Sequence, residues 1–170
     1  KKSDQSIFQS FTDFEDVAVL FLDVDGDKDQ DLFIGAGGNN LSGNKRQLQH
    51  RLYRNDGKGN FTIDINAFPP NEMNISVAAA YDFDKDGDED LFVGARSLPL
   101  TYGVSPTSYL YVNDGKGIFK DVAKEIAPAL ARIGMVTAAT WADVNGDTSR
   151  ELIVVGEWMS PAIFSYTGNK

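Results

Sequence analysis

The sequence predicts an all-β protein, a partial β-propeller of about three four-stranded antiparallel blades that belong to a larger ring. Two observations predict this fold. An acidic segment recurs three times along the chain, and a second segment centred on Asp-Gly recurs between its copies. With 170 residues, 42% of them hydrophobic, the chain is long enough to bury a core. We therefore expect a single β-propeller fragment over residues 1–170.

The acidic segments align without gaps through their aspartate-rich centres. The three copies are VAVLFLDVDGDKDQDLFIGAGG (17–38), VAAAYDFDKDGDEDLFVGAR (77–96) and TAATWADVNGDTSRELIVVGEW (137–158). In each copy a short apolar run precedes the acidic block and a β-branched or aromatic run follows it. This pattern predicts two buried strands joined by an acidic loop.

The Asp-Gly segments predict a second hairpin in each repeat. Their copies are LYRNDGKGNFTID (52–64) and LYVNDGKGIFKDV (110–122), and AIFSYTGNK (162–170) looks like the opening of a third. Glycine supplies the positive φ that a hairpin turn needs. The expected repeat units are roughly 8–66, 67–124 and 125–170, the last one truncated. The best helix signal, at 121–130, is broken by Pro128 and predicts only a turn or two.

Four strands in about 60 residues are the size of one propeller blade, and a propeller typically closes with about four to eight blades. Three blades cannot close a ring. We therefore expect the chain to be a fragment whose neighbours are the remaining blades of the same propeller.

The net charge of −9 is concentrated in three short windows. Residues 23–31, 82–90 and 143–151 hold 14 acidic and 3 basic side chains, a sum of −11, whereas the rest of the chain carries +2. Such local acidity disfavours nucleic acid as a partner. The chain has no cysteine, and its longest apolar runs of about six residues are too short to span a membrane.

The acidic windows have the pattern of calcium loops. Calcium takes about six to eight oxygen ligands, which a short loop can supply from alternate side chains and one main-chain carbonyl. Positions 1, 3, 5 and 9 would give side-chain oxygens and position 7 a carbonyl. The ligands expected for up to three Ca²⁺ ions are Asp23, Asp25, Asp27, Asp29 (carbonyl) and Asp31; Asp82, Asp84, Asp86, Asp88 (carbonyl) and Asp90; and Asp143, Asn145, Asp147, Ser149 (carbonyl) and Glu151.

Three alternatives to this interpretation are open from the residues alone. An EF-hand would need a glutamate at the twelfth position, where the chain has Ile34, Val93 or Val154, and helical flanks. Simple polar turns need only one or two Asp or Asn residues. Magnesium is less favoured than calcium because it retains its waters. The third loop, with a neutral Asn145, is expected to bind calcium most weakly.

These loops resemble the FG-GAP (VCBS) repeats found in integrin α-subunit propellers and many bacterial surface proteins. DVDGDKDQDLFIGAG, DFDKDGDEDLFVGA and DVNGDTSRELIVVGEW carry the resemblance, which covers essentially the whole chain, and LYRNDGKGNFT is most similar to the bacterial branch often joined to an ASPIC-type domain. The resemblance implies a seven- or eight-bladed propeller with Ca²⁺ in the first hairpin of each blade. It also implies a secreted or cell-surface location, with any signal peptide upstream of this segment.

Three functions are compatible with the resemblance. The first is a non-enzymatic binding or adhesion module that presents loops to a protein or carbohydrate ligand. The alternative is the propeller part of a polysaccharide-degrading enzyme such as a lyase, although no carboxylate pair or nucleophile–base set stands outside the metal loops. A purely structural role in a larger protein is the third. Fold alone does not decide among them.

Two long connections, 36–51 and 95–108, are expected at the end opposite the acidic loops, where recognition usually lies. Their basic and aromatic side chains either read an anionic glycan or a peptide, or pack on neighbouring blades. These side chains are Arg46, His50, Arg51, Arg96 and Tyr102. We expect His50, the single histidine, to be a loop residue and not a catalytic base. Trp141 and Trp158 are expected to pack between blades, with sugar stacking as the alternative for Trp158.

Overall fold

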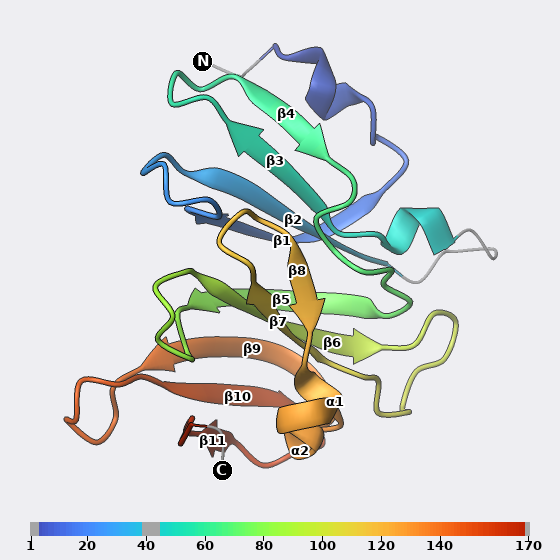
Figure 1. Cartoon of the computed structure of the whole chain (residues 1–170). Helices are drawn as coiled ribbons and strands as arrows, with labels where there is room; N and C mark the ends of the chain where they lie inside the picture. Colours follow the sequence, from blue (N-terminus) through green and yellow to red (C-terminus); the bar gives the residue numbers. More distant parts are fainter. Residues whose placement is uncertain (1–3, 39–44, 169–170) are drawn as a thin grey trace.

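The structure, a computed structural model, describes residues 4–38 and 45–168 and consists of three antiparallel sheets that follow one another along the chain (Figure 1). The all-β prediction is confirmed for the described residues. The strand orders are β1-β2-β3-β4, β5-β6-β7-β8 and β11-β10-β9. The strands are β1 (Glu15–Leu22), β2 (Asp31–Gly37), β3 (Arg51–Asn55) and β4 (Phe61–Asp64); β5 (Asn74–Tyr81), β6 (Asp90–Ser97), β7 (Tyr109–Asn113) and β8 (Phe119–Asp121); and β9 (Met135–Ala142), β10 (Glu151–Glu157) and β11 (Ala162–Phe164).

In the described part of the chain, helical structure is confined to single turns. The 3₁₀ turns are η1 (Ser6–Gln9) and η2 (Lys45–Leu48), and the α-helical turns are α1 (Ala123–Ile126) and α2 (Pro128–Ala131). The last two occupy the segment where the sequence predicts a turn or two, and Pro128 starts α2 because its fixed φ suits the first helical position. No helix in the described part of the chain is long and apolar enough to cross a membrane.

The predicted hairpins form at the predicted places. The acidic loops close on the strand pairs Leu22↔Asp31, Tyr81↔Asp90 and Ala142↔Glu151, so all three have the same register. The Asp-Gly hairpins close on Asn55↔Phe61 and Asn113↔Phe119. Their turns are longer than a two-residue Asp-Gly turn, because both glycines of Asp-Gly-Lys-Gly adopt positive φ.

The core lies between successive sheets. Side chains of the first and second sheets form one cluster, which comprises Leu22, Val24, Phe33, Leu52, Ala67, Ile75, Leu91, Val93, Tyr111 and Phe119. Side chains of the second and third sheets, together with α1 and α2, form another, which comprises Phe83, Phe92, Leu110, Val122, Ala123, Leu130, Ala131, Val136, Leu152 and Val154. The alternating apolar residues predicted from the repeats therefore bury the faces between sheets and not a single central layer.

Glycine allows the sheets to approach closely. A Cβ atom at Gly94 in β6 would lie 2.6 Å from Cγ1 of Val136 in β9, and one at Gly35 in β2 would overlap Cδ1 of Ile75 in β5. Both glycines follow an acidic loop at the same repeat position. The glycine at this position of the first two repeats is thus required by packing, whereas the third repeat has Val155 there.

The chain reversals place two kinds of loop at opposite ends of the sheets. In Figure 1 the acidic loops β1–β2, β5–β6 and β9–β10 all lie at one end. The connections β2–β3 and β6–β7 emerge at the other end, as the sequence predicts. Residues 39–44 of the first connection lie outside the described residues. The strands that begin each sheet, β1, β5 and β9, contact one another in sequence.

The N-terminal segment covers the outer strands of the first sheet, a feature that the repeat pattern does not predict. Phe8 packs against Tyr53 and Phe61, with ring centroids 5.3 and 5.6 Å apart. The side chain of Gln5 donates a hydrogen bond to the Gly59 carbonyl and accepts one from the Phe61 N–H. This segment therefore satisfies part of the outer edge of β4.

Candidate functional site

The aspartate at position 1 organises the backbone of the acidic loops by accepting hydrogen bonds from it. In the first loop, Oδ1 of Asp23 accepts a hydrogen bond of 2.8 Å from the Gly26 N–H, and Oδ2 accepts one of 3.0 Å from the Lys28 N–H. The third loop repeats both bonds, from Gly146 and Thr148 to Asp143. These bonds, from the N–H groups three and five residues on, turn the backbone around the carboxylate.

Positions 4 and 6 of every loop adopt left-handed backbone conformations, and only one of the two is glycine in each case. The pairs are Gly26 and Lys28, Lys85 and Gly87, and Gly146 and Thr148. The second loop thus exchanges the glycine and non-glycine positions of the other two. Residues other than glycine are strained in this region, so each loop stores strain at one position.

The carboxylate at position 9 joins the two hairpins of a sheet. Asp31 is buried; its Oδ2 accepts from the Val24 N–H at 3.2 Å and its Oδ1 from the Asn55 N–H at 2.8 Å. Asp90 accepts equivalent bonds from Phe83 and Asn113. The carboxylate at position 9 therefore has a structural role, because it holds the base of the loop against the second hairpin.

The first two loops fit a hard divalent cation. One oxygen from each of three carboxylates lies within 4.8 Å of the others, in the sets Asp23, Asp25 and Asp27, and Asp82, Asp84 and Asp86. Oδ1 of Asp82 and Oδ1 of Asp29 are buried and have no hydrogen-bond partner within 4–38 and 45–168. Unpaired buried oxygens beside like charges are costly unless a cation completes them. This donor set, all oxygen and mainly carboxylate, is the one that calcium prefers.

The pKa values of these carboxylates reflect the same crowding. Burial, followed by the charges of Asp86 and Asp82, raises the pKa of Asp84 above its ordinary value. Burial also raises the pKa of Asp90 to about 7, despite the two backbone bonds that it accepts. In the first loop the pKa values of Asp29 and Asp31 are raised, again chiefly by burial. The carboxylates of these two loops therefore have too little positive charge near them to offset their burial and mutual repulsion.

The third loop is satisfied differently. The side-chain amide of Asn145 donates to Oδ2 of Asp147 at 3.1 Å and to Oε1 of Glu151 at 2.9 Å. Backbone hydrogen bonds, the largest from Gly146, lower the pKa of Asp143. Within the described residues, only the first two loops gather three carboxylates at the distance given above. The amide thus supplies internally part of the compensation that a cation would supply in the other two loops.

Two side chains that contact the acidic loops were not predicted from the sequence. Arg54 donates from Nη1 to Oδ2 of Asp25 at 3.0 Å, and from Nη2 to Oδ2 of Asp64 and to the Lys116 carbonyl. Glu89 accepts a hydrogen bond of 3.1 Å from the Asp23 N–H and so links the first two loops. A signal for Arg54 was available, because its repeat equivalent is Val112 (LYRN against LYVN).

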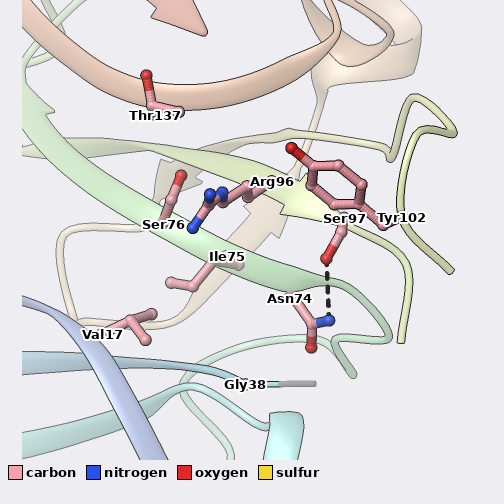
Figure 2. A pocket seen from close by; sticks show the side chains of 9 residues that line it. All are labelled: Val17, Gly38, Asn74, Ile75, Ser76, Arg96, Ser97, Tyr102 and Thr137. Carbon is pink, nitrogen blue, oxygen red and sulfur yellow. Dashed lines mark hydrogen bonds between the residues drawn. The ribbon is translucent and has the colours of Figure 1, made fainter. Parts of the chain in front are cut away.

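The opposite end holds a cavity of about 550 Å³ (Figure 2). It lies against the first strands of all three sheets and the end of β6. Its lining residues are Val17, Gly38, Asn74, Ile75, Ser76, Arg96, Ser97, Tyr102 and Thr137. Arg96 and Tyr102, both candidates from the sequence, come together here, and Glu157 of β10 binds both of them.

The other loop candidates are not part of this cavity. His50 and Arg51, 5% and 3% exposed, lie in the core, so a role for them in surface recognition is wrong and packing is the correct alternative. His50 packs against aromatic rings of the first two sheets and their connection, and Arg51 pairs with Asp16. Arg46 is exposed and pairs with Asp13 at 3.4 Å.

The two tryptophans differ. Trp141 packs between the second and third sheets: it lies parallel to Phe83, and its Nε1 donates to the Ala79 carbonyl. The packing prediction is confirmed for Trp141. It is wrong for Trp158, which is 79% exposed and contacts Tyr102 edge to face. A surface position for so large a ring leaves it available to a ligand.

The stacked antiparallel sheets and their in-register acidic hairpins define a β-propeller-type repeat module. A sequence model of the FG-GAP-like repeat family matches residues 23–93, from the first acidic loop into β6. This stretch is similar to an FG-GAP-like repeat, and repeats of that family are typically non-catalytic scaffolds. No curated protein matches the chain significantly.

Proposed function

We propose that the protein is a calcium-binding β-propeller scaffold, secreted or on the cell surface, that presents the end opposite its acidic loops to a protein or glycan ligand. The convergence of three carboxylates in each of the first two loops carries the proposal. The similarity of residues 23–93 to an FG-GAP-like repeat supports it, because that repeat suggests a β-propeller-type binding module.

Calcium would be held by the side chains at positions 1, 3, 5 and 9 and the carbonyl at position 7 of each loop, where it would neutralise the crowded carboxylates. We rank the second loop first. In the first loop Arg54 already compensates Asp25, and in the third loop Asn145 replaces a carboxylate. Affinity follows ligand charge and rigidity, so these differences favour the second loop.

The role of the metal in this proposal is structural. A site filled at about 100 times its dissociation constant stabilises the fold by roughly 2.7 kcal/mol. Extracellular calcium modules typically bind at about 10⁻⁴–10⁻³ M, which suits a compartment with millimolar calcium. This agreement supports a secreted or cell-surface location.

A larger ring is part of the proposal. Val19 and Phe21 of β1 are exposed, whereas their repeat equivalents in β5, Ala78 and Ala80, pack against the first sheet. The same face of the first sheet would pack on a further blade in the same way. A ring of seven or eight blades would bury both exposed side chains.

The alternative, part of a polysaccharide lyase, lacks support at the cavity. Its lining contains no histidine, lysine or carboxylate that could act as a base within the described residues. The hydrogen bond to Glu157 raises the pKa of Tyr102, which keeps the phenol protonated and leaves little phenolate to act as a base. We therefore favour binding over catalysis.

Thermal unfolding followed by tryptophan fluorescence, with calcium, magnesium or chelator, tests the metal proposal. Trp141 is a suitable reporter because it stacks on Phe83, whose N–H binds Asp90 in the second loop. We expect calcium to raise the melting temperature and magnesium to raise it little. Asp84→Asn should remove much of the calcium shift, and Glu125→Gln, which changes an exposed carboxylate on α1, should leave it intact. An unchanged shift in Asp84→Asn would overturn the assignment.

A further inference from the structure

We propose that the cavity at the first strands of the three sheets binds a neutral saccharide, with Tyr102 and Trp158 forming an aromatic rim. The inference rests on the proposed function as a binding module and names its site and ligand class. The volume of the cavity, about 550 Å³, lies within the usual range for small-ligand sites, about 300–1,000 Å³. Figure 2 shows polar side chains from β5, β6 and β9 around the hollow.

Asn74 provides the first specific requirement for a ligand. Its side chain is only 4% exposed and lines the cavity. Nδ2 donates to the Ser97 hydroxyl at 3.1 Å, whereas Oδ1 is buried without a partner among the described residues. A buried acceptor that receives no hydrogen bond costs about 1–3 kcal/mol of stability. A ligand that donates a hydrogen bond at this position would remove that cost.

The neighbouring hydroxyl groups are also acceptors. Ser76 donates its proton to the Val136 carbonyl at 2.6 Å, and Thr137 donates to the Val155 carbonyl at 3.4 Å. With its proton committed to the main chain, the Ser76 oxygen can accept from a ligand, and the Thr137 hydroxyl, whose own bond is longer, can accept as well. Three acceptors on adjacent strands match a ligand that carries several hydroxyl donors, as a sugar does.

The charges at the cavity select against ionic ligands. Nε and Nη2 of Arg96 bind Oε1 of Glu157 at 3.1 and 2.6 Å, so the guanidinium charge is compensated. The Tyr102 hydroxyl donates to the other oxygen of the same carboxylate. An anionic ligand would have to compete with Glu157, and a cationic one would meet Arg96. The balance favours a neutral molecule.

The aromatic rim supplies an apolar surface beside these polar groups. The Trp158 ring is exposed and lies edge to face with Tyr102, at a centroid distance of 5.6 Å. Trp158 has a left-handed φ of 56°, and Gly103 lies close beneath the indole. A strained, exposed tryptophan points to a functional role. The C–H face of a sugar ring can stack on such a surface while its hydroxyls reach the acceptors.

Calorimetric titration and tryptophan fluorescence at saturating calcium test the proposal. The probes are cello-, malto-, manno- and xylotriose, with trigalacturonate and a capped neutral Ser/Thr-rich peptide as comparisons. We expect at least one neutral trisaccharide to bind, more tightly than either comparison, and to change the Trp158 emission. Binding of none of the four, or tighter binding of trigalacturonate or the peptide, would overturn the proposal.

Two variants localise the binding. Trp158→Ala and Thr137→Val change exposed side chains, and each should weaken saccharide binding about three- to tenfold, the effect of one contact. Thr140→Val, on the same strand but outside the cavity, is the matched control and should bind normally. Equal affinities in all three variants would exclude this cavity. The calcium-dependent melting shift is recorded on the same samples, so loss of saccharide binding with an intact shift rejects this inference and leaves the metal proposal standing.

Discussion

Nη1 of Arg54 lies 3.0 Å from Oδ2 of Asp25, so the first acidic loop has a built-in counter-charge. The second loop has none from this position, because its equivalent residue is Val112. This single difference between two otherwise similar repeats separates the electrostatics of the two candidate metal sites.

We expect Arg54→Val to tighten calcium binding at the first loop several-fold, since removal of a cation beside a ligand carboxylate favours binding of another cation. Isothermal titration with calcium measures the change. Arg54→Lys keeps the charge and is the matched control, with a smaller change expected. Weaker calcium binding in Arg54→Val would show that the arginine organises the loop more than it competes with the metal.

Thr148 provides a test of strain in the third loop. It is β-branched and has a φ of 73°, a conformation that costs about 1–2 kcal/mol in residues other than glycine. We expect Thr148→Gly to raise the free energy of unfolding by about 1 kcal/mol, measured by urea denaturation with chelator present. Thr148→Ala retains the strain and should not gain as much. Equal stability of the two variants would argue against stored strain.

The contact between Gly35 and Ile75 tests close packing of the first two sheets. A methyl group at Gly35 would overlap Cδ1 of Ile75, so Gly35→Ala should destabilise the protein by about 1–3 kcal/mol. Ile75→Val removes that atom at a cost of about 0.5–1.5 kcal/mol. The double variant should lose less than the sum of the two, as a double-mutant cycle would measure. Strict additivity would contradict the overlap.

His50 makes stability sensitive to acid. Burial, together with the neighbouring Arg51 charge, lowers the pKa of His50 to about 3, below its ordinary value of 6.5. Neither ring nitrogen has a hydrogen-bond partner among the residues that the structure describes, and the ring packs against Tyr109 and Tyr111. Between pH 6.5 and 3 the unfolded chain binds a proton that the folded chain does not. Stability is therefore lost as the pH falls below 6.5, by up to about 1.4 kcal/mol per pH unit.

His50→Leu should remove this contribution. We expect the variant to lose about 2 kcal/mol less than the wild type between pH 7 and pH 5, as measured by urea denaturation at each pH. Comparison with the wild type cancels the titration of Asp90 and the other carboxylates. Parallel pH profiles for the two proteins would show that His50 finds a partner, such as a buried water, that stabilises its charged form.

The repeated hairpins could be predicted from the sequence because their determinants are local. The acidic loop needs an aspartate at position 1 and left-handed residues at positions 4 and 6, and both recur at fixed spacing. The alternating apolar residues indicate strands for the same reason. Asp31 and Asp90, at position 9, end these loops, but their bonds to the second hairpin join residues 24 and 23 positions apart and have no local signal.

The fate of the long-loop residues could not be predicted, since burial depends on the whole chain. His50 and Arg51 carry the polar chemistry of a recognition loop, yet the N-terminal segment and the second sheet enclose them. Trp158 has a large apolar side chain of the kind that usually packs in a core, yet it is exposed. Neither the burial of His50 and Arg51 nor the exposure of Trp158 can be recognised from the residues beside them in the sequence.

The sequence by itself determined the repeat, the hairpins and the oxygen-rich loops, because each is set by residues within about ten positions of one another. Tertiary structure alone decided which residues distant in the sequence meet. It brought Asn74, Thr137 and Arg96 to one cavity, and it placed Arg54 against Asp25 and Glu89 against Asp23. These residues lie 22 to 66 positions apart, and the pairing of strands within a sheet and the packing of one sheet on the next, not the local backbone, set their distances.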